Sequence, residues 1–213
     1  MRRLATCHGG TRDARMSLPG ASRMRPTARL PAPTDPDGTP RQLITELGRR
    51  VGEREAAGWC SDLLAGADPH DFVEMLDYLG RNCRAAAFDP SWYDYWPRTW
   101  GARGLLYVWA PSAAPVVVEH LGDEHWRPAE MCLKVASLRE LGEAGPGAER
   151  LSHHELPRVR ATAIRCLGKV GDTEHVAAVE GALEDAQEAV RGAAVRALAL
   201  LDRRLDLGLD LAD

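Results

Sequence analysis

Apolar residues recur at the three- and four-residue spacing of amphipathic helices along most of the chain after residue 38. The segment 39–42, TPRQ, combines a Thr N-cap, a Pro at the first helical position and a Gln three residues after the cap. These are the elements of a capping-box start. Leu43, Leu47 and Val51 follow on one face, so the pattern predicts a helix from residue 40 onward.

A second helix start, at residues 68–69 (DP), leads into Phe72, Leu76 and Leu79 on one face. Between the two predicted helices, residues 59–64 carry one Trp and two Leu side chains. They predict either a short helix or a packed loop.

The C-terminal half of the chain repeats itself. Residues 159–168, VRATAIRCLG, align with residues 190–199, VRGAAVRALA, at an offset of 31. Residues 133–142, LKVASLRELG, align with the first of these segments at an offset of 26. A repeat of this length is typical of a solenoid, a propeller or a similar array.

A fourth, degenerate unit is indicated at twice the longer offset. There Arg98 and Asp123 fall on Arg160 and Asp185, which places the start of this unit near Pro97. The sequence therefore predicts four units, of 36, 26 and 31 residues and a truncated last one.

The clearest unit shows why such repeats must stack. Apolar positions share one face of residues 159–170, a Gly-Asp turn follows at 171–172, and apolar positions return at helical spacing over 176–183. A single pair of helices cannot cover its own apolar faces. Neighbouring units must cover them, and the result is an α-solenoid.

The motif V-R-x-x-A-x-x-x-L-G-x-x-G-D spans residues 159–172 and is partly repeated from residue 190. It resembles the short bacterial HEAT repeats, the class often called phycobilisome-lyase-like. The resemblance covers roughly residues 97–202 and is strongest over 156–202. It implies an all-α fold, an α-solenoid of about four HEAT-like helix pairs, acting as a scaffold or adaptor that binds another protein.

The chain is predicted to have four parts. A disordered basic leader, residues 1–38, holds five prolines and no sustained apolar period. A divergent N-terminal helical cap takes residues 39–95, the HEAT-like array takes 96–202, and a C-terminal tail takes 203–213. Leucines that alternate over 205–211 form an apolar edge able to pair with a second copy, so the oligomeric state stays open.

Charge is distributed unevenly. Residues 1–40 hold seven Arg and three Asp, a net +4, and the whole chain carries −4, so the remainder carries −8. An acidic body disfavours a phosphate-binding surface on the folded part.

The excess of Arg over Lys is consistent with a GC-rich genome. The Arg-rich start is also typical of an organellar transit peptide, or of a misassigned start with Met16 or Met24 as the true one.

The cysteines and the hydropathy exclude further classes. Five Cys without a C-x-x-C pair argue against a disulfide framework and against a zinc site built on thiolates. They indicate a reducing compartment, and we expect a cytoplasmic protein. No stretch approaches the roughly 18 apolar residues of a membrane span, so no membrane association is expected.

Seven of the 12 aromatic residues lie within residues 92–109. One interpretation is that they pack the junction between the cap and the first repeat, as is expected of Trp100 and Trp109. The other is an exposed recognition patch for a partner protein, because Trp, Tyr and Arg dominate interface energetics. The residues of that candidate patch are Trp92, Tyr93, Tyr95 and Trp96, with Asp94 and Arg98.

The second helices of a solenoid line its concave surface, where partners usually bind. The polar residues there are candidate contacts as well. They are His120, Glu149, His175 and Glu180.

An enzymatic function is the first alternative. Some HEAT-like proteins are di-iron hydroxylases with His-Glu pairs inside successive repeat helices, and bilin lyases share the resemblance. This chain has one such pair, His154–Glu155, and it lies in a turn. Residues 161–162 and 192–193 hold Ala-Thr and Gly-Ala where that family's pairs lie, and no residue matches a lyase residue. We therefore expect no catalytic residue, no metal site and no cofactor.

Nucleic-acid binding is the second alternative. Its candidates form an Arg row on the repeats: Arg158, Arg160, Arg165, Arg191 and Arg196. Two of them recur at one repeat position, where such a side chain commonly bonds to acidic or carbonyl groups of the neighbouring unit. We assign the row to structure for this reason.

Overall fold

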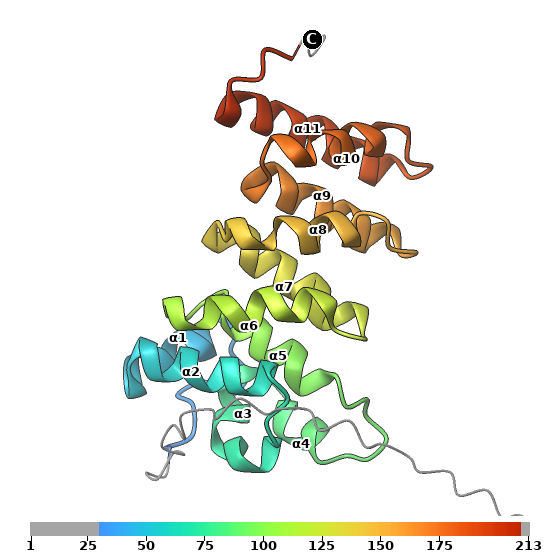
Figure 1. The fold of residues 1–213 in the computed structure, drawn as a ribbon. Helices are drawn as coiled ribbons and strands as arrows, with labels where there is room; N and C mark the ends of the chain where they lie inside the picture. Colours follow the sequence, from blue (N-terminus) through green and yellow to red (C-terminus); the bar gives the residue numbers. More distant parts are fainter. Residues whose placement is uncertain (1–29, 210–213) are drawn as a thin grey trace, which may run out of the picture.

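The structure, a computed structural model, describes residues 30–209. Over this range every regular element is a helix, and from residue 96 onward the helices stack in chain order up to the last one, α11 (Glu188–Leu205) (Figure 1). The predicted all-α solenoid is confirmed. No helix of the described part is both long enough and apolar enough to cross a membrane.

The N-terminal cap begins with the predicted capping box. The Thr39 hydroxyl accepts a hydrogen bond from the Gln42 backbone N–H at 3.3 Å, and the Gln42 side chain accepts one from the Thr39 N–H at 2.9 Å. Residues 53–64, predicted as a short helix or a packed loop, form a helix of 12 residues. The elements of the cap are α1 (Pro40–Val51), α2 (Glu53–Leu64), the 3-10 turn η1 (Pro69–Phe72), α3 (Val73–Leu79) and α4 (Cys83–Ala87).

The array alternates long first helices with short second helices. The first helices are α5 (Trp96–Gly104), α7 (Trp126–Arg139), α9 (Pro157–Val170) and α11. The second helices are α6 (Ala114–Glu119), α8 (Gly145–Leu151) and α10 (Val176–Gly181). Each second helix follows a 3-10 turn, namely η2 (Pro111–Ala113), η4 (Gly142–Ala144) and η5 (Thr173–His175). The last first helix, α11, has no second helix after it within the described residues.

The repeat period is 31 residues, and the predicted offset of 26 for residues 133–142 is wrong. The second helices begin at residues 114, 145 and 176, and α7 and α9 both have 14 residues and end at Arg139 and Val170. Helices rich in Ala and Leu align at more than one offset, because only their apolar spacing is compared. The true register is set by the helix ends, such as Glu140 at φ 53°, which terminates α7.

Residues 30–38, which the sequence pattern assigns to the leader, pack on the cap. Pro33 is buried, and the hydroxyl of the buried Tyr78 donates to the Pro31 carbonyl at 2.8 Å. A buried Tyr hydroxyl needs a hydrogen-bond partner, and residues 30–38 supply one from the segment predicted as leader. The remainder of that prediction, residues 1–29, lies outside the described residues.

The C-terminal end folds back on the array. Leu205, Leu207 and Leu209 are half-buried against the core, and the Leu209 N–H donates to Asp202 Oδ1 at 2.9 Å. The apolar edge predicted for this segment is therefore largely covered by the chain itself.

Close approach between neighbouring repeats requires a small residue at Gly168. A Cβ at this position would lie 2.8 Å from Ala197 Cα and 2.9 Å from Ala197 Cβ, across the contact between α9 and α11. Gly192, in the interior of α11, has more room, because a Cβ there would meet only the end of the Arg196 side chain, at 3.5 Å.

We expect the Gly168→Ala variant to lose about 1–3 kcal/mol of unfolding free energy, because the added methyl group forces α9 and α11 apart. The matched Gly192→Ala variant should gain about 0.5–1 kcal/mol, since Ala loses less conformational entropy in a helix. Urea unfolding followed by circular dichroism measures both. Equal effects of the two substitutions would contradict the close packing at Gly168.

Candidate functional site

The aromatic residues before and within α5 divide into an exposed pair and a packed set. Trp92 and Tyr93, in the loop before the helix, are 46% and 67% exposed. Tyr95 and Trp96 are half-buried, and Trp100, one turn further along α5, is buried. Of the four aromatic residues in the candidate patch, only Trp92 and Tyr93 are therefore exposed, and Tyr95 and Trp96 are largely packed.

Ring contacts brace this loop against the next repeat. The ring centroids of Trp92 and Trp96 are 5.6 Å apart, and the Arg127 guanidinium lies 5.0 Å from the Trp96 ring centroid. Tyr95 contacts the His125 ring with a centroid distance of 4.5 Å. Arg127 and His125 lie at the start of α7. The ring contacts therefore connect the loop that carries Trp92 and Tyr93 to the next repeat.

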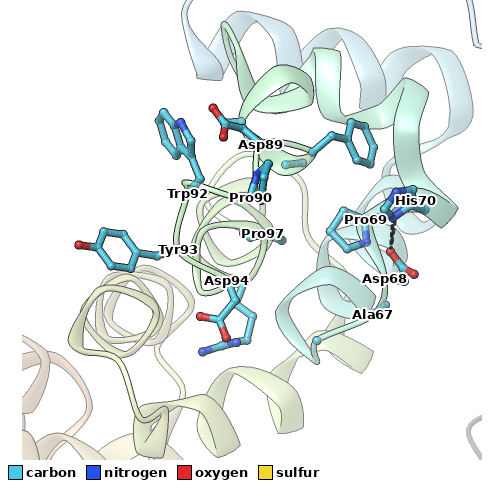
Figure 2. A pocket seen from close by; sticks show the side chains of 15 residues that line it. Ala67, Asp68, Pro69, His70, Asp89, Pro90, Trp92, Tyr93, Asp94 and Pro97 are labelled. Atoms are coloured by element: carbon cyan, nitrogen blue, oxygen red, sulfur yellow. Dashed lines mark hydrogen bonds and ion pairs between the residues drawn. The ribbon is translucent and has the colours of Figure 1, made fainter.

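Trp92 and Tyr93 border a hollow of about 510 Å³. Figure 2 shows both side chains projecting on one side of it and His70 on the opposite side, with Pro90 and Pro97 between them. Phe88, 37% exposed, also lines the hollow and contacts the His70 ring at a centroid distance of 4.6 Å. The small apolar lining residues are Ala67, Pro69, Ala86, Ala87, Pro90 and Pro97.

Three carboxylates line the same hollow: Asp68, Asp89 and Asp94. Hydrogen bonds from the Ser91 hydroxyl and backbone N–H lower the pKa of Asp89. Hydrogen bonds from the backbone N–H and the ring of His70 lower the pKa of Asp68. Both carboxylates are therefore ionised at neutral pH, and the hollow combines apolar surface with negative charge.

Arg98, predicted as a member of the recognition patch, forms an ion pair inside the protein. Its Nε donates to Asp123 Oδ2 at 2.8 Å and its Nη2 to Asp123 Oδ1 at 3.1 Å. The Asp123 side chain is only 3% exposed, and the hydrogen bond to it raises the pKa of Arg98. This bidentate pair fixes α5 against the connection to α7, so the charge of Arg98 is not available to a partner.

The same pair recurs two repeats later. Arg160 Nε and Nη2 donate to the two carboxylate oxygens of Asp185 at 2.7 and 2.9 Å, 62 residues after the first pair. In the repeat between them, Ala129 and His154 occupy the corresponding positions. His154 Nδ1 accepts from the Leu156 N–H at 2.9 Å, a turn contact that Asp123 and Asp185 also make two residues ahead. The predicted turn role of His154 agrees with this contact.

We expect Asp185→Asn to lower the unfolding free energy by about 1–2 kcal/mol at neutral pH, because Arg160 loses its charged partner. The hydrogen bond from Arg160 lowers the pKa of Asp185. Its contribution is therefore complete above the unfolded-state pKa, roughly 4, and is lost as the pH falls through the lower folded-state pKa.

The measurement is urea unfolding of both proteins from about pH 7 down to about pH 2. The unfolding free energies of the two proteins should converge in acid. As a control, Glu184→Gln, at the exposed neighbouring position, should leave the unfolding free energy unchanged at both ends of this pH range. A difference that stays constant with pH would contradict the ion-pair assignment.

The four candidates on the second helices do not form one surface row. His175 is buried, its Nδ1 accepts from the Asp172 N–H at 3.0 Å, and its ring packs against Gly145. It is therefore not a partner contact, because its side chain fills the contact between two repeats. His120 is half-buried and bonds through Nδ1 to the Val116 carbonyl at 2.9 Å.

Only two of these candidates keep a repeating position. Glu149 and Glu180 are 31 residues apart and therefore equivalent in α8 and α10. Glu149 is half-buried and Glu180 is exposed.

The Arg row of the repeats is largely engaged within the protein. Arg158 Nη2 donates to the buried Glu130 carboxylate at 2.8 Å, and Arg191 Nη1 donates to the Asp185 carbonyl at 2.7 Å. Together with Arg160, these contacts agree with the structural assignment of the row. They leave fewer free charges for nucleic-acid phosphates.

The four described cysteines are free and buried: Cys60, Cys83, Cys132 and Cys166. Burial raises the pKa of Cys60 and of Cys166 to about 12 and that of Cys83 to about 11. These thiols are therefore protonated and unreactive at neutral pH. Within residues 30–209, no three His, Cys, Asp or Glu side chains gather in a group that could hold a metal ion.

Sequence reasoning missed one side of the hollow. The sequence pattern predicts only a helix start at Asp68, and it does not distinguish Phe88 or His70 as candidate site residues. Phe88 and His70 are 18 positions apart in the chain and meet because α3 and α4 fold back on each other. No local motif marks such a contact, and the only sequence signal is that Phe88 is one of two Phe in the chain.

Comparison with known proteins relates part of the chain to a family. Residues 147–207 match the family model for HEAT repeats. This range contains α9, α10 and α11, which include the most regular repeats. No curated protein and no solved structure matches the chain.

Proposed function

Because residues 147–207 match HEAT repeats and the described chain forms an α-solenoid, we propose that this protein acts without catalysis, as a scaffold or adaptor that binds another protein through the aromatic hollow at the cap end of its array. One observation carries the proposal. Five large apolar side chains are exposed within residues 30–209, and three of them, Phe88, Trp92 and Tyr93, line this hollow. Contiguous exposed apolar surface of this kind marks interaction sites.

The energetics favour binding at this place. Trp and Tyr offer large contact areas with few rotatable bonds, and they are enriched among the residues that dominate interfaces. The contact between Trp92 and Trp96 holds the exposed ring before a partner arrives. A braced ring loses little entropy on binding, so more of the contact energy appears as affinity.

In this proposal, the remainder of the array extends the binding surface beyond the hollow. Glu149 and Glu180 are retained as secondary contacts in this proposal, because they recur on successive second helices. The proposal also places the protein in the cytoplasm, which its buried free thiols support.

No observation within residues 30–209 favours the enzymatic alternatives, bilin attachment or metal-dependent hydroxylation. His154, from the one His-Glu pair, bonds to the turn that contains it. Nucleic-acid binding is disfavoured by the three carboxylates that line the aromatic hollow, since base stacking on aromatics needs a positively charged groove.

A photo-crosslinking amino acid tests the proposal directly. Benzoylphenylalanine replaces Tyr93 in one variant and Val195 in a matched control, because both positions are more than half exposed and lie on different elements. After irradiation in the native cell, position 93 should give a discrete protein adduct that position 195 does not. Absence of an adduct at 93, or the same adducts at both positions, would overturn the proposal.

A pair of Trp substitutions separates binding from folding. We expect Trp92→Ala to change the unfolding free energy by less than about 0.5 kcal/mol, because the side chain is half exposed. Trp96→Ala should cost about 2 kcal/mol, because the ring lies between Trp100 and Arg127. Urea unfolding gives both values. If the two substitutions cost the same, Trp92 is a packing residue and the proposed patch does not exist.

A further inference from the structure

The hollow has more carboxylates than cationic side chains. Asp68, Asp89 and Asp94 line it, and the one Arg among the lining residues, Arg98, is held by the buried Asp123 and interacts at longer range with Asp94. The chain from residue 41 onward also carries a formal charge of −8. A partner segment of positive charge is therefore attracted to this end of the molecule.

The protein itself repeatedly places a guanidinium over a Trp ring. Arg127 lies over both Trp96 and Trp126, at 5.0 and 4.5 Å from the ring centroids. Arg158, at the start of α9 in the next repeat, lies 4.9 Å from the centroid of the Trp126 ring. These contacts form one row of alternating aromatic and cationic groups along the starts of α5, α7 and α9.

Trp92 is the end of that row. Its ring contacts Trp96, yet no Arg or Lys of the described residues lies over it. Asp89 and Asp94 flank it in the same loop. An exposed Trp face next to carboxylates suits an arginine side chain, which stacks on the ring and donates hydrogen bonds to the carboxylates.

The small apolar lining suits the residues beside such an arginine. Pro90 and Pro97 lie between the two walls of the hollow, and Pro69 lies beside His70 on one wall, so all three add apolar surface to the lining. A proline or an aliphatic side chain can pack there while the neighbouring arginine reaches the rim. Aromatic-lined grooves are known to accept extended, proline-containing segments.

We propose that the hollow binds an extended, arginine-containing segment of a partner protein, with an arginine on Trp92 and Asp89 and an apolar residue on the prolines. This inference rests on the proposed function and specifies the partner chemistry. It predicts salt-sensitive binding, because charge attraction contributes part of the affinity.

The test is calorimetric titration of the full-length protein with three synthetic peptides. The probe alternates Arg with Pro and Leu, and two counterparts carry Lys or Glu at the Arg positions. The Arg peptide should bind at least about tenfold more tightly than the Glu peptide and more tightly than the Lys peptide, which cannot form the bidentate contact. Equal affinity for the Arg and Glu peptides would overturn the proposal.

Site-directed variants locate the binding. Trp92→Ala and the double variant Asp89→Asn with Asp94→Asn should each weaken the Arg peptide about tenfold. Val195→Ala, at another exposed apolar position, should leave binding unchanged, and thermal unfolding verifies that all variants are folded. Peptide binding that these variants do not weaken would place the peptide elsewhere and overturn the proposal.

The chain's own residues 1–29 hold seven Arg and one Asp and are the competing occupant. If replacing these seven Arg by Gln raises the affinity for the Arg peptide tenfold or more, the chain's own segment occupies the hollow, and the partner assignment is wrong. Unchanged affinity supports a partner in trans. A crosslink at Tyr93 without preference for Arg peptides would overturn only this inference, whereas absence of the crosslink overturns the proposed function itself.

Discussion

Each helix pair of the array has apolar surface on two sides and can cover only one of them, so every unit depends on contact with its neighbours. The contact between α9 and α11 shows how close this approach is, because Gly168 lies directly against the backbone of Ala197. The two ends of the array need other cover. At the C-terminal end, Leu207 and Leu209 fold back on the array, and at the N-terminal end the helical cap covers the first repeat.

The aromatic hollow is a consequence of joining this cap to the array. The cap does not share the 31-residue period, and α2 packs closely on α5, where a Cβ at Gly101 would lie 2.5 Å from the Cys60 carbonyl oxygen. The large rings of Trp96 and Trp100 stack on each other in α5. The same segment carries Trp92 and Tyr93 beyond the packed region and into solvent. One segment therefore contains both the packed rings and the exposed rings that we propose for recognition, and the contact between Trp96 and Trp92 joins the two sets.

The sequence predicted the repeat architecture because apolar spacing, turn glycines and the capping box at Thr39 are local signals. It also aligned Arg98 with Arg160 and Asp123 with Asp185, and the structure shows both as ion pairs. It did not predict the register of α7, since similar small-residue helices align at several offsets. It also misjudged His175 as an exposed contact, because burial depends on the neighbouring Gly145 and not on the residue type. The wall formed by Phe88 and His70 arises from tertiary contacts and has no local sequence signal.

The central claim is that a protein partner binds chiefly at the cap end, with the second helices giving only secondary contacts. Hydrogen–deuterium exchange, measured with and without the partner isolated through the Tyr93 crosslink, tests this most directly. The account predicts the strongest slowing of exchange over residues 66–70 and 86–98, which contain the lining of the hollow, and a smaller change over α8 and α10. Protection confined to α8 and α10, with none at the hollow, would contradict it.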